Sequence, residues 1–238
     1  MAAALITLVL LSYLLGSIPT GFLVAKAKGV DIRSVGSGNI GATNVFRILG
    51  KGPGIFVLTA DAVKGALAVL VVGSLTVSVM QVLMPETASV VFGPHIGEIR
   101  LADSNLIRVW EHHPALAGIC AILGHNYTCW LRFKGGKGIA TTAGVFAALA
   151  PAAFGIALAT WLVVFAVSRY VSLASIVAAV ALPLAVWLTG NGALLIGVST
   201  ALGALAIYKH KANIERLRAG TESRIGSKPS EPPEDKKT

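Results

Sequence analysis

Long apolar stretches separated by short polar segments make up most of the sequence. Five of these stretches carry no charged side chain and have about the length of a membrane-spanning helix: 3–25, 65–84, 114–131, 170–188 and 193–208. The helix over 65–84 is expected to begin earlier, near Ile55, which places Asp61 and Lys64 on one helix face, where they can pair. This pattern predicts an all-α integral membrane protein.

The stretch 139–167 also lacks charge, but it is long for one span and short for two, and Pro151 lies near its middle. If it crossed the membrane once, the basic segment at the end of the chain would lie on the other side of the membrane from the other basic segments. We therefore predict two half-length helices that meet around Pro151 and return to the side on which they began. Irregular backbone inside a membrane has to be covered by protein, so this hairpin should pack in the centre of a bundle of about seven helices.

Charge differs between the connections. Basic residues predominate in 26–51, in 132–138 and after 208, whereas 85–113 carries four acidic residues against two arginines. Because Lys and Arg are enriched in cytoplasmic loops, we expect the three basic segments and the C-terminus in the cytoplasm, and the N-terminus and 85–113 outside. Residues 1–226 would then form one membrane domain with an extracytoplasmic insertion at 85–113. Residues 227–238, rich in proline and charge, are expected to be a disordered cytoplasmic tail.

The composition agrees with a membrane protein. Of the 238 residues, 55% are hydrophobic and 13% are charged, with a mean hydropathy of +0.75. Soluble domains have about 25% charged residues, so soluble enzymes and disulfide-rich secreted scaffolds are excluded. The net charge of +9 suits cytoplasmic loops and phosphate-bearing ligands better than nucleic acid. Cys120 and Cys129 lie in an apolar stretch and are expected to be buried free thiols.

Residues 36–47 form the first of three unusual polar segments. The glycines in this segment are Gly36, Gly38 and Gly41, the hydrogen-bonding side chains are Ser37, Asn39, Thr43 and Asn44, and Arg47 follows. Glycines let the backbone approach a ligand, N–H groups before a helix bind anions, and arginine can bind phosphate in a bidentate manner. A flexible polar loop is the alternative, but a linker does not require this density of donors.

The second polar segment contains Lys134, Gly135, Gly136, Lys137 and Gly138. It is not a nucleotide-binding P-loop, because Leu131 and Gly138 stand where that motif needs glycine and a hydroxyl residue. A lysine among glycines before a helix still indicates a phosphate site. The alternative is a basic anchor at the membrane surface, which does not need three glycines.

The third polar segment follows the last apolar stretch, where His210 and Asn213 share one face of a helix. Hydroxyl residues at 168–175 fall on the same side of the membrane. We expect no metal site, because the chain has neither a His-Glu-x-x-His motif nor a cysteine–histidine ligand spacing. His95, His112 and His113 lie in the outer connection, where a solvated loop explains them.

These segments, in this order, resemble the bacterial acyl-phosphate:glycerol-3-phosphate acyltransferases, the PlsY family. The resemblance rests on GSIPTG at 16–21, GSGNIGATNVFR at 36–47, GH at 124–125, FKGGKGIAT at 133–141 and HKANIERLRAGTE at 210–222. It implies a bacterial inner-membrane enzyme with a cytoplasmic active site and no cofactor. Such enzymes transfer a fatty acyl group from acyl phosphate to the 1-hydroxyl of glycerol 3-phosphate, giving lysophosphatidic acid and phosphate, the first step of phospholipid synthesis. A soluble enzyme that produces acyl phosphate would be a functional partner.

The resemblance also implies the roles of individual residues. The catalytic set would be Ser37, Arg47, Lys137, His210 and Asn213, with Glu222 more structural. The substrate-binding set would be Gly36, Gly38, Asn39, Gly41, Thr43, Asn44, Lys134, Gly135, Gly136, Gly138 and Ser175. The chain departs from the family at Thr128, where proline is usual, and in the insertion 85–113.

Two questions stay open at this point. A membrane transporter of a phosphate ester is the alternative function, although transporters place their site near the bilayer midplane and often contain internal repeats. Here the polar segments gather at one face, and the two halves of the chain show no repeat. In an acyltransferase, the proton of the attacking hydroxyl could pass either to His210 or to the phosphate of the acceptor.

Overall fold

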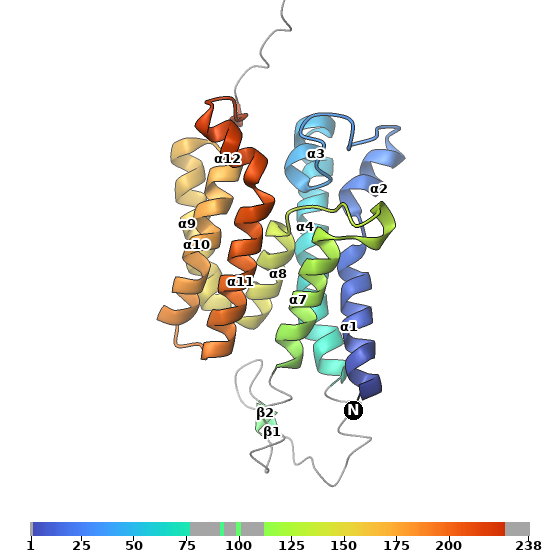
Figure 1. The fold of residues 1–238 in the computed structure, drawn as a ribbon, viewed down its shortest axis with the longest axis vertical. Helices are drawn as coiled ribbons and strands as arrows, with labels where there is room; N and C mark the ends of the chain where they lie inside the picture. Colours follow the sequence, from blue (N-terminus) through green and yellow to red (C-terminus); the bar gives the residue numbers. More distant parts are fainter. Residues whose placement is uncertain (1, 77–90, 93–98, 101–111, 227–238) are drawn as a thin grey trace, which may run out of the picture.

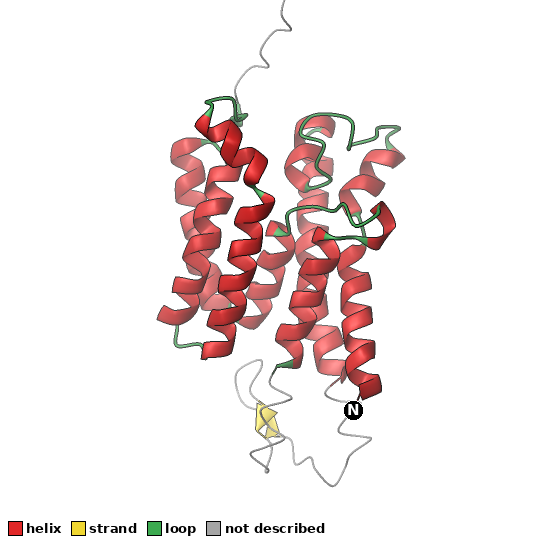
Figure 2. Cartoon of the chain, viewed as in Figure 1, coloured by secondary structure: helices red, strands yellow, loops and turns green. Residues whose placement is uncertain are grey.

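Helices make up almost all of the computed structural model, which describes residues 2–76, 91–92, 99–100 and 112–226 (Figures 1 and 2). The elements are α1 (Ala2–Ser17), α2 (Thr20–Ala27), α3 (Ala42–Leu49), α4 (Lys51–Leu67), the π-helix η1 (Ala68–Gly73), β1 (Val91–Phe92), β2 (Ile99–Arg100), α7 (His113–Asn126), the 3-10 helix η3 (Cys129–Leu131), α8 (Ile139–Leu149), α9 (Pro151–Ser168), α10 (Val171–Leu188), α11 (Ala193–Lys209) and α12 (Lys211–Arg218). The all-α prediction agrees with this architecture; within 85–113 the described residues add one short antiparallel pair, β1–β2. The predicted tail 227–238 lies outside the described residues.

Several helices can cross a membrane. The segments that are long and apolar enough among the described residues are Ala2–Ala27, Lys51–Thr76, Pro151–Ser168 and Val171–Leu188, and α11 with α12, bent by 57°, can form a further span. Each of the seven segments in which the sequence predicts a helix contains one in the described part of the chain. The predicted early start of the helix over 65–84 is confirmed, since α4 begins at Lys51.

Two predicted spans differ from the observed helices. The first is interrupted between α1 and α2 because Pro19 has no N–H for the helical ladder and disfavours helical backbone at Ile18. The third ends at Asn126 and continues as an extended turn instead of reaching residue 131. In that turn Thr128 has φ −64°, the value that proline would impose, so threonine preserves the backbone geometry expected of proline here.

Pro151 divides 139–167 as predicted, but into unequal helices. α8 has 11 residues and α9 has 18, so the prediction of two half-length helices is wrong for α9. α8 begins inside the bundle and lies against α4, whereas α9 lies on the outside beside α10 and runs back toward the end of the bundle that holds α3 and α12 (Figure 1). α9 is apolar on all sides and exposes Val163 and Val167, which a lipid-facing helix can do. The prediction that both helices of this hairpin pack in the centre of the bundle is therefore also wrong for α9.

Small residues hold α8 close to α4. A Cβ on Gly65 of α4 would collide with the carbonyl of Thr141, and a Cβ on Gly144 of α8 would collide with the carbonyl of Ala62. Close contact at small residues is a common means of helix association in membranes. It places the start of α8, directly after Lys137, at a fixed position relative to α4.

The predicted pair of Asp61 and Lys64 is confirmed, and both side chains are buried, with Oδ1 and Nζ 2.7 Å apart. The Thr20 hydroxyl donates to Asp61 over 3.1 Å, and the Lys64 ammonium donates to the Ile18 carbonyl over 2.9 Å. Nδ1 of His125 on α7 lies 3.0 Å from the same ammonium. A buried charge has to be paired, and this pair connects the break between α1 and α2 to α4 and α7.

The ends of the bundle differ in character. The N-terminus and the β1–β2 pair lie at one end, whereas α2, α3 and α12 lie at the other (Figure 1). The first and third polar segments therefore meet at a single end, opposite the insertion. This is the relative arrangement that the distribution of charge predicts.

Candidate functional site

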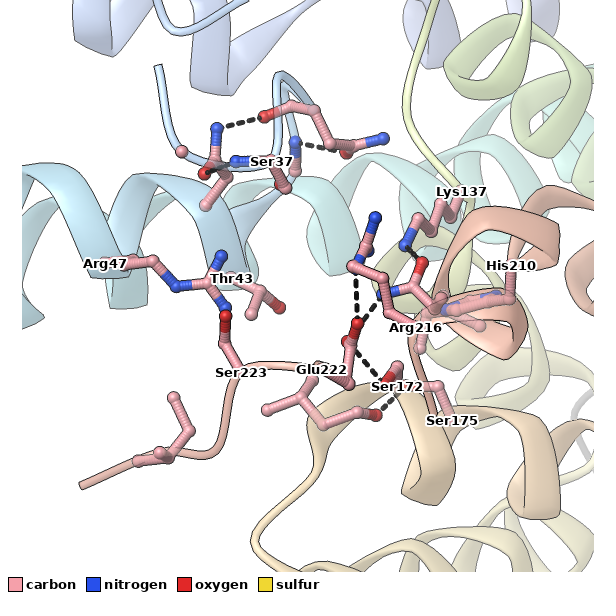
Figure 3. Close-up of a pocket in the computed structure, with 18 residues that line it drawn as sticks. Ser37, Thr43, Arg47, Lys137, Ser172, Ser175, His210, Arg216, Glu222 and Ser223 are labelled. Atoms are coloured by element: carbon pink, nitrogen blue, oxygen red, sulfur yellow. Dashed lines mark hydrogen bonds and ion pairs between the residues drawn. The ribbon is translucent and has the colours of Figure 1, made fainter. Parts of the chain in front are cut away.

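A cavity of about 330 Å³ lies where the three polar segments meet (Figure 3). It is lined by Gly36, Ser37, Asn39, Gly41, Thr43, Asn44, Arg47, Lys137, Ile139, Val171, Ser172, Ser175, His210, Asn213, Arg216, Glu222, Ser223 and Ile225. The lining includes all five residues of the predicted catalytic set and six of the predicted substrate-binding set. Segments more than 170 residues apart in the chain thus contribute to one pocket.

Asn44 shapes the first wall of the pocket. Its side-chain carbonyl accepts the Ser37 N–H over 2.9 Å, and its amide group donates to the carbonyls of Ile32, Val35 and Asn39. Gly36 has φ +61°, a left-handed conformation that favours glycine, and a Cβ there would collide with the Asn44 carbonyl oxygen. A buried asparagine therefore folds the loop onto α3 by satisfying its backbone groups.

Arg47 lies on α3 four residues after Thr43, so both side chains face the pocket. Its guanidinium group points toward Ser223 on the opposite wall (Figure 3). Within the described residues, the side chain of Arg47 forms no hydrogen bond and no ion pair. Its planar set of donors is therefore available to a ligand, and this geometry matches a phosphate group.

The loop before α8 brings Lys137 into the pocket but directs its glycines elsewhere. The N–H groups of Gly135 and Gly136 donate to the carbonyls of Asn126 and His125, over 3.2 and 3.0 Å. A Cβ on Gly136 would collide with the His125 ring. These glycines are needed because the loop lies directly on the end of α7.

Five predicted substrate-binding residues consequently lie outside the pocket lining: Gly38, Lys134, Gly135, Gly136 and Gly138. The backbone N–H groups of the first four already donate to carbonyls of the protein, so they cannot form the expected phosphate cradle. Gly138, with φ +79°, makes the turn that starts α8 and abuts the Asn126 side chain. Of residues 134–138, only Lys137 contributes to the lining of the pocket.

The Lys137 ammonium donates a hydrogen bond to the side-chain carbonyl of Asn213 on α12. Burial lowers the pKa of Lys137 to about 8, with Glu222 opposing the shift and Arg216 and Arg47 adding to it. The ammonium therefore begins to lose its proton only slightly above neutral pH. A bound anion would stabilise it.

Glu222 organises the remaining wall. It accepts hydrogen bonds of 2.7 Å each from the Ser172 hydroxyl, the Asn213 amide and the Arg216 guanidinium (Figure 3). Burial raises the pKa of Glu222, but these three donors outweigh it and keep the pKa below its usual value. An ionised Glu222 thus ties α12 to α10, as the expected structural role requires.

His210 stands at the junction of α11 and α12 and is buried. Its Nδ1 lies 2.7 Å from the Ala206 carbonyl, and because a carbonyl can only accept, Nδ1 carries the proton in this contact. Nε2 is then left with a lone pair. Ser175 on α10 accepts a hydrogen bond from the Trp161 indole over 3.2 Å.

The pocket combines three cations with one carboxylate. Arg47, Lys137 and Arg216 outnumber Glu222, so the pocket carries a net positive charge suited to phosphate. Among the described residues no group of three His, Cys, Asp or Glu side chains is arranged to hold a metal ion.

Three polar or charged members of this lining, Ser172, Arg216 and Ser223, have no role assigned from the sequence, and Glu222 has only a structural one. Ser172, Arg216 and Glu222 stand in segments that the sequence marks as polar, but their mutual hydrogen bonds arise only when α10 and α12 meet. Ser223 had no signal of its own. It reaches the pocket because the chain turns back after Gly220, where the N–H groups of Thr221 and Glu222 donate to the Arg216 carbonyl.

The chain is similar to known proteins in sequence and in fold. A family model described as glycerol-3-phosphate acyltransferase matches residues 6–220. Glycerol-3-phosphate acyltransferases of Geotalea daltonii and Geobacter sulfurreducens are 46% and 44% identical, over 92% and 90% of this chain and 96% and 94% of theirs. The fold is similar to a crystal structure of PlsY (YgiH), an integral membrane glycerol 3-phosphate acyltransferase, in its glycerol 3-phosphate form. The TM-score is 0.76 at 38% identity, covering 93% of this chain and 96% of that one. A lysophosphatidic acid form of PlsY gives a TM-score of 0.73 at 37% identity, covering 93% and 95%.

Proposed function

The chain belongs to the glycerol-3-phosphate acyltransferase family, and on this premise we propose that its pocket transfers a fatty acyl group from acyl phosphate to the 1-hydroxyl of glycerol 3-phosphate. The products are lysophosphatidic acid and inorganic phosphate. The protein is a multi-pass membrane protein, so an acyl donor and a lipid product can both reach it from the bilayer.

The observation that carries the proposal is the surplus of cations in the pocket. Each substrate bears a phosphate group with a charge of about −1.5 to −2 near pH 7. Arg47 and Lys137 stand on different walls, and the Arg47 guanidinium has no partner among the described residues. Two separate cations can hold two phosphate groups side by side, which brings the reacting hydroxyl and carbonyl together.

The reaction needs one bond to form and one to break. The oxygen of the 1-hydroxyl attacks the acyl carbonyl carbon, and the tetrahedral intermediate then expels inorganic phosphate by cleavage of the carbon–oxygen bond to the phosphate. The cations of the pocket stabilise the charge on the departing phosphate. The hydroxyl proton leaves as the new ester bond forms.

We assign that proton to the phosphate of the acceptor. His210 positions the substrate through Nε2 by accepting a hydrogen bond from the 2-hydroxyl, because a 1-hydroxyl that donated to Nε2 could not direct its single proton to the phosphate. The Nδ1–H contact with Ala206 fixes the ring and leaves Nε2 as an acceptor. Burial and the charge of Lys137 lower the pKa of His210 to about 4, although the Ala206 carbonyl and Glu222 oppose the shift, so a histidine that took the proton would be poorly stabilised. The phosphate dianion of the acceptor takes the proton more readily, because its second pKa is near 6 by analogy with phosphoserine.

The distribution of basic residues supports a cytoplasmic location for the pocket in a bacterial inner membrane, with the N-terminus outside. Glycerol 3-phosphate would then enter from the cytoplasm. Acyl phosphate would be supplied by a soluble enzyme that produces it, as the family resemblance implies.

The experiment that tests the donor uses purified protein in detergent with labelled glycerol 3-phosphate. Acyl phosphate, acyl-CoA and acyl-carrier protein carrying the same acyl chain are compared at equal concentration. We expect lysophosphatidic acid with acyl phosphate alone. Equal or faster product formation with either thioester would overturn the assignment of the donor while leaving the acyl acceptor in place.

A further inference from the structure

The end of α7 is a junction between distant parts of the chain. The last carbonyls of a helix have no partner within it and need donors from elsewhere. At α7 the Asn126 carbonyl receives two, the Gly135 N–H over 3.2 Å and the Lys209 ammonium over 3.0 Å. The neighbouring His125 carbonyl receives the Gly136 N–H over 3.0 Å.

Both donors to Asn126 belong to segments that carry pocket residues. Gly135 lies two residues before Lys137, and Lys209 lies directly before His210. One oxygen atom outside the pocket lining therefore joins the loop that carries Lys137 to the end of the helix that positions His210 and Asn213.

We propose that Lys209 is a positioning residue that sets the relative placement of Lys137 and His210. This rests on the proposed function, since the two residues it places are assigned to the substrates. Lys209 touches no substrate in this assignment and acts through the Asn126 carbonyl.

A second contact fixes the Lys209 side chain. Its ammonium lies 3.9 Å from the centre of the Tyr127 ring, within the range of a cation–π interaction. The C-terminal end of α7 also carries the negative end of the helix dipole, which attracts a cation. The ammonium is thus held by a carbonyl, a ring and a helix end together.

The link through Asn126 matters because the direct side-chain hydrogen bond between these two segments in the described part of the chain lies inside the pocket. The Lys137 ammonium donates to the Asn213 side chain. A bound phosphate adds a charged acceptor for the same ammonium and can draw it away from Asn213, so this bond can weaken just when the geometry has to be maintained. The Lys209 bond is remote from the substrates and is unaffected by the competition.

The test compares three variants of the full-length protein in detergent. Lys209→Met keeps a similar apolar stem but removes the donor and the charge, and we expect kcat to fall about 10- to 100-fold, the scale of a misplaced catalytic group. Lys209→Arg can donate to the carbonyl and stack on the ring, so it should stay within about threefold of the parent. Lys211→Met is the matched control, because it also removes a lysine next to His210. Lys211 is exposed, and its ammonium lies 5.4 Å from the centre of the Tyr208 ring. The kcat of this control should not change.

A second readout needs no activity. Backbone hydrogen exchange of residues 133–138 is measured without substrates, and Lys209→Met should exchange at least fivefold faster there than the parent, with Lys209→Arg and Lys211→Met unchanged. If Lys209→Met fails to fold, Tyr127→Leu replaces it, with the same direction of change in both readouts. Parental kcat and parental exchange in the folded variant would overturn the proposal. Absence of lysophosphatidic acid in the parent would refute the proposed function instead, and the exchange result would still decide the link.

Discussion

Lys137 is the pocket cation whose charge is most sensitive to pH near neutrality. The Lys137 side chain is half-buried and donates to Asn213 of α12, and burial lowers its pKa to about 8, whereas guanidinium groups keep their charge in proteins. The two cations assigned to the substrate phosphates therefore respond differently to alkaline pH.

This difference predicts a pH dependence of substrate affinity. The charged form of Lys137 predominates below about pH 8 and is lost above it, while the phosphate of glycerol 3-phosphate keeps its full charge over that range. The KM for the substrate whose phosphate Lys137 holds should rise up to about tenfold for each pH unit above 8. Lys137→Arg is the control, because its guanidinium keeps its charge; a rise that persists unchanged in this variant would assign the effect to another group.

His210→Gln separates the two routes for the hydroxyl proton. If His210 positions the substrate without taking the proton, the amide replacement should mainly raise the KM for glycerol 3-phosphate and leave kcat within about tenfold. General-base catalysis contributes about 10²–10⁴-fold, so a fall in kcat of that size at an unchanged KM would identify His210 as the base. Steady-state kinetics at matched folded yield makes the distinction.

The residue types predicted the chemistry of the site better than they predicted the role of each glycine. Arg47, Lys137, His210 and Asn213 line the pocket as expected, because cations and amides have few other uses at the end of an apolar bundle. Glycine in a loop is consistent both with an anion cradle and with close backbone packing. Only the three-dimensional contact with the end of α7 shows that packing explains Gly135 and Gly136.

At the scale of elements, the packing of α8 on α4 decides where Lys137 lies. Gly144 faces the Ala62 carbonyl with no room for a Cβ, whereas Gly155 on the neighbouring α9 has no atom within 4 Å of the position a Cβ would take. The same substitution is therefore expected to have opposite consequences on adjacent helices.

Gly144→Ala should lower the melting temperature in detergent by several degrees and reduce activity, because α8 has to move away from α4. Gly155→Ala should be neutral or stabilising, since alanine is favoured over glycine in a helix by about 1 kcal/mol. Thermal unfolding of the two variants measures the difference. Equal melting temperatures would contradict the tight packing of α8 on α4.

The lengths of α8 and α9 show what hydropathy and charge could not determine. A break at Pro151 and a return to the same end followed from proline chemistry and from the sidedness of the basic segments. How the apolar residues divide between the two helices depends on the packing partner. α8 is short because it fits against α4, while α9 extends along α10 at the outside of the bundle.

For the whole molecule, the separation of the two ends predicts which residues face the cytoplasm. Single cysteines can be placed in a background in which Cys120 and Cys129 are replaced by alanine. Ala193→Cys, at the end of the bundle that holds the N-terminus, should react with an impermeant thiol reagent in intact cells. Val30→Cys and Arg218→Cys should react only after the membrane is opened. Labelling of Arg218→Cys from outside would reverse the proposed orientation.

The proposed reaction depends on the pocket residues, on the packing of the helices and on the arrangement of the whole bundle, because the pocket forms where the three polar segments meet. The most direct measurement follows labelled glycerol 3-phosphate and released phosphate at once, using purified protein and acyl phosphate in detergent. We predict one lysophosphatidic acid for each phosphate released by the protein, with both strongly reduced in Lys137→Met. No conversion in detergent, together with movement of unmodified glycerol 3-phosphate into sealed vesicles containing the protein, would contradict the acyltransferase and identify a transporter.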